Sequence, residues 1–131
     1  MPLDGNPAKY ERRIATKDEF WSATPRERLA MLAYALRAPM PDGLEFRWHF
    51  PRPMPECGTV GCSLGLAKYL WGVDTDFAAE TFHMTDGQVS QLFFTHSMMS
   101  RRSKHHGRGP LAAADMADAI DRYLTTGRVE P

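Results

Sequence analysis

The chain has 131 residues, which is close to the commonest size of one domain, and 43% of them are hydrophobic while 24% are charged. Because 16 basic residues balance 16 acidic ones, no net field draws the protein onto nucleic acid or an anionic membrane. Two cysteines are too few for a disulfide-stapled secreted domain, and no apolar run approaches the length of a membrane span, so we expect a cytoplasmic protein.

The first segment, residues 1–20, contains proline and glycine followed by charges, and it lacks the apolar stretch of a signal peptide. We expect a flexible N-terminal tail over this range. A single helical domain is then expected over residues 21–131, because that length is sufficient for one hydrophobic core.

The first predicted helix begins at Thr24. The pair Thr24 and Glu27 has the spacing of a capping box, and Pro25 occupies the first helical position. The prolines after Ala38 end the helix. Its buried face is predicted by apolar residues at helical spacing: Leu29, Leu32, Ala33 and Leu36.

Residues 44–50 predict the one β element of the fold. Apolar and polar residues alternate there with the period of two that is typical of a half-buried strand. A strand needs a partner, and the segment Gly127–Glu130 is the candidate that the sequence offers. The apolar positions are Leu44, Phe46, Trp48 and Phe50.

Residues 57–71 predict a turn that enters a buried helix. Thr59 is a candidate N-cap, and Gly72 would end the helix. Because apolar residues cover more than one face of this segment, we expect its helix to lie at the centre of the domain.

Three further helices follow. They are predicted at residues 76–82, at residues 86–93 after a second capping box, Thr85 with Gln88, and from Pro110 to a closing Gly127. A polar loop separates the last two. The expected fold is therefore mostly α, a compact bundle of four to five helices with a minimal β element at about residues 44–50.

The stretch from Cys57 to Ala67 reads Cys-Gly-Thr-Val-Gly-Cys-Ser-Leu-Gly-Leu-Ala. It resembles a Cys-Gly-Thr-x-x-Cys-x-x-Gly-x-Ala motif in a group of uncharacterised small bacterial and phage proteins, and the resemblance covers about residues 24–130. Where that group often has Trp or His, this chain has Leu66. The resemblance implies a fold and a bacterial or mobile-element setting, and it implies no activity.

Cys57 and Cys62 carry the strongest candidate chemistry. Cys62 would lie in the first turn of its helix, where the helix dipole favours a thiolate. With nearby histidines, the pair has ligand types that zinc accepts, although the spacing matches no standard zinc motif. A thiol or zinc site is therefore one alternative, and zinc is the one cofactor considered. The other interpretation is two small buried side chains in a tight turn.

Residues 79–93 have the spacing of a helix-turn-helix. Gln88 and Gln91 would then lie on the second helix and contact base edges. A basic loop follows over residues 101–108, and its Arg101, Arg102, Lys104 and Arg108 would contact phosphates. A DNA-binding regulator is therefore a second alternative, although two short packed helices and a solvated loop produce the same pattern.

Our leading hypothesis is a non-enzymatic binding or accessory protein, of phage or mobile-element type, that acts by binding a host protein. No catalytic residue is assigned. We expect a protein partner and no membrane contact, with nucleic acid as the alternative partner. The low net charge also favours self-association.

Overall fold

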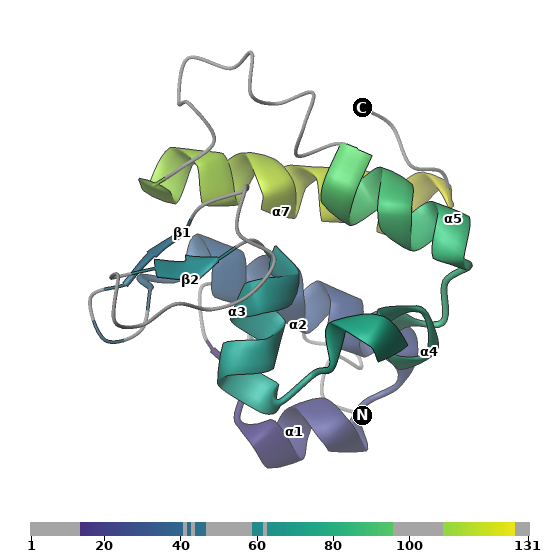
Figure 1. Ribbon diagram of the computed structural model, residues 1–131, viewed down its shortest axis with the longest axis horizontal. Coiled ribbons are helices and arrows are strands. Elements are labelled where there is room, and N and C mark those ends of the chain that lie inside the picture. The colour runs from purple at the N-terminus through teal and green to yellow at the C-terminus, as the bar shows by residue number, and fades with distance from the viewer. Residues whose placement is uncertain are drawn as a thin grey trace.

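The computed structural model describes residues 14–40, 42, 44–46, 59–61, 63–95 and 109–127. This part of the chain is mostly helical, as predicted (Figure 1). It contains six α-helices, one more than the largest number expected. They are α1 Lys17–Ser22, α2 Pro25–Arg37, α3 Ser63–Trp71, α4 Ala78–Phe82, α5 Asp86–Val89 and α7 Gly109–Thr126.

The additional helix is α1, which begins inside the range predicted as a tail. A capping box opens it: the Glu19 N–H donates to Thr16 Oγ1 at 3.1 Å, and the Glu19 carboxylate accepts the Thr16 N–H at 2.9 Å. Phe20 is fully buried in the core. The tail boundary at residue 20 is therefore wrong, because the domain already includes α1. A helix of six residues is too short to show a periodic apolar stripe in the sequence.

The most extensive helix contact joins α2 and α7, which lie side by side in Figure 1. The predicted capping box of α2 is present, with Thr24 Oγ1 and the Glu27 carboxylate each accepting a backbone N–H. At the other end, Arg37 donates to Asp118 at 2.7 Å and to Asp121 at 2.6 Å across the two helices. The predicted apolar face of α2 is buried. Buried residues of α7 include Ala113, Met116, Ala117 and Ile120.

The β element is a two-stranded parallel sheet of β1, Glu45–Phe46, and β2, Thr59–Gly61. The described partner of β1 is β2, while Gly127 of the expected partner segment closes α7 at a φ of +74° and residues 128–130 lie outside the described residues. One expectation is corrected here. Thr59 is part of β2 and is not the N-cap of α3, which begins at Ser63. Threonine is common both in strands and at helix N-caps, so the local sequence did not show which of the two roles Thr59 has.

Helix α3 has the central position predicted for it. Its residues Leu64, Leu66, Ala67 and Trp71 are all fully buried, and the helix contacts α1, α2 and β2. Gly72 ends it at a φ of +76°, a conformation that favours glycine. None of the helices in the described part of the chain is both long and apolar enough to cross a membrane.

The chain then turns through η4, a 3-10 helix at Thr75–Phe77, into α4 and α5. The predicted capping box of Thr85 and Gln88 opens α5. The helix continues as η5, a π-helix over Ser90–Thr95. Val89 and Leu92 are buried against the core, as a pair of packed short helices requires.

Candidate functional site

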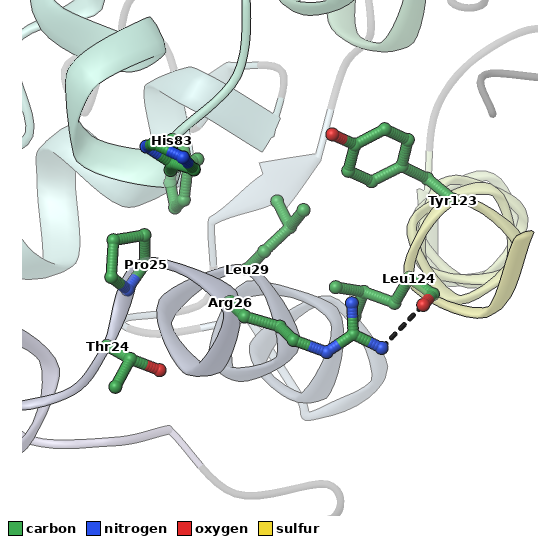
Figure 2. A pocket seen from close by; sticks show the side chains of 8 residues that line it. Thr24, Pro25, Arg26, Leu29, His83, Tyr123 and Leu124 are labelled. Carbon is green, nitrogen blue, oxygen red and sulfur yellow. Dashed lines mark hydrogen bonds between the residues drawn. The ribbon is translucent and has the colours of Figure 1, made fainter. Parts of the chain in front are cut away.

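A half-open pocket of about 350 Å³ lies where three helix ends meet. The beginning of α2, the end of α4 and the end of α7 surround it (Figure 2). Leu29 and Phe82, both buried, form its apolar floor. The eight lining residues include no carboxylate; they are Thr24, Pro25, Arg26, Leu29, Phe82, His83, Tyr123 and Leu124. This volume is at the lower end of the range for small-ligand sites.

Arg26 forms the cationic side of the pocket. Its Nη2 donates to the backbone oxygen of Leu124 at 2.5 Å, so a long flexible side chain is held in one place between α2 and α7 (Figure 2). A guanidinium has five N–H donors, and this is the one hydrogen bond of the Arg26 side chain to the described residues. Its other donors have no partner among the residues that the structure describes.

Backbone oxygens near the end of α7 already accept hydrogen bonds. Thr126 Oγ1 donates to the oxygen of Arg122 at 2.8 Å, and the Gly127 N–H donates to that of Tyr123 at 2.8 Å. With Arg26 on Leu124, three successive carbonyls accept hydrogen bonds. The beginning of α2, which is the positive end of its helix dipole, faces the same space and carries Arg26.

His83 forms the opposite side of the pocket in an unusual backbone conformation. It follows α4 in the left-handed region, with φ +52° and ψ +57°. The N–H groups of His83 and Met84 return to Glu80 and Ala79, in a Schellman motif whose left-handed position is most often glycine. Because a side chain is strained in that conformation, a histidine there is retained at a cost in stability.

We expect a His83→Gly variant to be more stable than the wild type by about 1 kcal/mol, because glycine adopts a positive φ without steric cost. Urea unfolding measures the difference. The matched control is His83→Ala, which removes the imidazole and keeps the strained Cβ, so it should show no gain. Equal stability changes in the two variants would contradict this account.

The phenol of Tyr123 completes the polar rim. It extends from α7 across the pocket on the side opposite His83, with Leu29 between them (Figure 2). The site thus combines a buried apolar floor with a guanidinium, an imidazole and a phenol. Sequence analysis did not find it, because its residues come from three separate segments and no motif links them.

Two of the predicted contact residues lie in the described chain, both on the helix after Thr85. The amide oxygen of Gln88 accepts the Thr85 N–H at 2.9 Å, so it forms half of the capping box. Gln91 is exposed. Neither lines the pocket. The structure therefore does not bring them together with the site found at α2, α4 and α7.

The other predicted site residues lie outside the described residues. They are Cys57, Cys62, Arg101, Arg102, Lys104 and Arg108. No group of three His, Cys, Asp or Glu side chains suited to a metal occurs within the ranges that the structure describes. The zinc site at Cys57 and Cys62 stays a prediction, which elemental analysis of the purified protein would test.

A separate polar contact joins Tyr69 of α3 to Asp42. The Tyr69 hydroxyl donates to Asp42 Oδ2, and Asp42 has a φ of +55°. This hydrogen bond, then burial and then the charge of Asp42 raise the pKa of Tyr69 above its ordinary value of 10.0. Because the folded-state pKa is raised, the contact stabilises the fold below the ordinary pKa, and this contribution is lost as pH rises through the folded one.

We expect Asp42→Asn to lower the pKa of Tyr69 in the folded protein, because the neutral phenol loses its anionic acceptor. Asparagine tolerates the left-handed backbone, so the loop should keep its conformation. Ultraviolet absorbance of the phenolate follows the titration. In a Tyr69→Phe background the same substitution should leave the titration unchanged; a shift persisting there would assign the effect to another tyrosine.

No family model matches the chain, and no curated protein or solved structure matches it.

Proposed function

We propose that this chain is a non-enzymatic binding protein that acts by binding another protein, and that the pocket between α2, α4 and α7 is its recognition site. The observation that carries the proposal is the pocket itself: an apolar floor beneath three hydrogen-bonding groups, one of them a cation fixed by Leu124. A buried apolar surface beside a few oriented polar groups is the usual composition of a binding site.

The strained His83 supports the same conclusion. Strained backbone is concentrated at functional sites, because only a gain in function offsets its cost. The bacterial or mobile-element setting, and with it a host protein as the partner, derives from the resemblance of the Cys57 to Ala67 segment alone.

The test is affinity capture from a bacterial lysate, followed by calorimetric titration with each captured protein in purified form. We expect one captured protein to bind the wild type and an exposed-surface control, Lys68→Ala, with equal affinity. Arg26→Ala and His83→Gly should weaken that binding at least about tenfold, as expected when a charge-assisted contact is removed. Equal binding by the wild type and the three variants would show that the pocket is not the recognition site. The absence of any partner would contradict the proposed function.

A DNA-binding regulator is the second candidate. The observation that favours it is the helix after Thr85, which buries Val89 and Leu92 and leaves Ser90 and Gln91 exposed. A gel shift on duplex DNA tests it. Binding should weaken with salt and be lost in an Arg101/Arg102/Lys104 triple alanine variant. No retardation at low salt would contradict this candidate.

A further inference from the structure

We propose that the pocket recognises the carboxyl end of a polypeptide, taking the terminal carboxylate at Arg26 and an apolar terminal side chain over Leu29 and Phe82. The inference rests on the proposed function, because it names the part of a partner protein that the same pocket binds.

The charge of the lining specifies an anion. Arg26 lies in the first turn of α2, at the positive end of the helix dipole, where a cation is unfavourable unless an anion accompanies it. The acidic residue that follows it in the sequence, Glu27, is buried and already accepts the Thr24 N–H at 2.9 Å. A carboxylate from a ligand would therefore supply the charge that the pocket lacks.

The geometry of the donors specifies a carboxylate with more than one contact. The guanidinium of Arg26 is planar and pairs with two carboxylate oxygens at once. Its position is fixed before binding by the oxygen of Leu124, so little side-chain entropy is lost when a ligand arrives. His83 and Tyr123, on opposite sides of the pocket, carry further hydrogen-bonding groups (Figure 2).

The apolar floor of the pocket indicates that the carboxylate belongs to a residue with an apolar side chain. Leu29 and Phe82 are buried core residues whose outer surfaces line the pocket, together with Pro25 and the half-buried Leu124. At about 350 Å³ the pocket has room for one large apolar side chain and its carboxylate. Because the pocket is half-open, the preceding residues of a chain can leave past the exposed Thr24.

The experiment uses three probes and the full chain labelled for amide NMR. The first is a hexapeptide, Ser-Gly-Ser-Gly-Ser-Phe, with a free carboxylate; the second is the same peptide with a terminal amide; the third is 3-phenylpropionate. We expect the free acid to shift the backbone amides of Arg26, His83 and Leu124, and the amide peptide to bind about tenfold more weakly. In Arg26→Gln the preference should fall below about threefold, while Lys68→Gln should keep it.

Each of the other outcomes would contradict a specific part of the proposal. Equal binding of acid and amide would refute carboxylate recognition and leave the pocket as the recognition site. Binding of 3-phenylpropionate as strong as that of the peptide would assign the pocket to a small acid and refute the polypeptide end. If none of the probes shifts these amides while the captured partner does, only this inference fails; if neither the probes nor a partner shifts them, the proposed function fails with it.

Discussion

A Trp71→Ala variant is expected to lose about 3–5 kcal/mol of the free energy of unfolding, the usual range when a buried tryptophan is truncated. Trp71 is fully buried at the end of α3, and its ring stacks on Phe20 with centroids 4.2 Å apart and an interplanar angle of 9°. Its indole Nε1 donates to the oxygen of Ala15 at 2.8 Å. The variant would therefore leave both a cavity and a buried carbonyl without a donor.

The matched variant is Trp71→Phe, which keeps a stacked ring and removes the indole N–H. It should lose about 1–3 kcal/mol, because the oxygen of Ala15 then lacks its partner. Urea unfolding measures both losses, and amide hydrogen exchange should show α1 opening first, since Trp71 holds that helix. A loss below about 1 kcal/mol for Trp71→Ala would refute the anchoring role.

Several helix ends were predicted well from the local sequence, although the beginning of α3 was not. The boxes at Thr24 and Thr85, and the glycines at 72 and 127, were predicted correctly because each depends on residues only three or four positions apart. The helix α1 was missed. It also opens with a capping box three residues apart, Thr16 with Glu19, but six residues show no periodic apolar stripe, and its packing depends on Phe20 against Trp71, two residues far apart in the chain.

The sheet and the pocket show the same limit. The strand β1 was predicted from its alternation, but its pairing with β2 joins segments that only the fold brings together. The pocket needs α2, α4 and α7 at once, and its signal in the sequence is a single histidine at a position where glycine would be the stable choice. A Schellman motif is usually recognised in a sequence by its glycine, so the motif at the end of α4, which has His83 in that position, was not predicted.

Replacing Arg28 with methionine is expected to lower the free energy of unfolding by about 2–4 kcal/mol. The guanidinium of Arg28 donates to the oxygens of Phe20 and Trp21 at 3.1 Å each, and to that of Thr81 at 3.2 Å. It thereby ties the end of α1 to α4, and it lies 5.1 Å from the centroid of the Trp21 ring. Methionine keeps the apolar stem, so the loss reports the three hydrogen bonds and the cation–π contact.

Two controls separate geometry from charge. Arg28→Lys retains the positive charge but not the planar fork, so it should recover only a minor part of the loss. Arg26→Gln, two residues away on the same helix, should cost less than about 1 kcal/mol, because Arg26 is exposed and donates to one carbonyl. Full recovery by lysine would show that charge alone suffices. Equal losses at both positions would contradict the difference in hydrogen bonding, three backbone oxygens for Arg28 against one for Arg26.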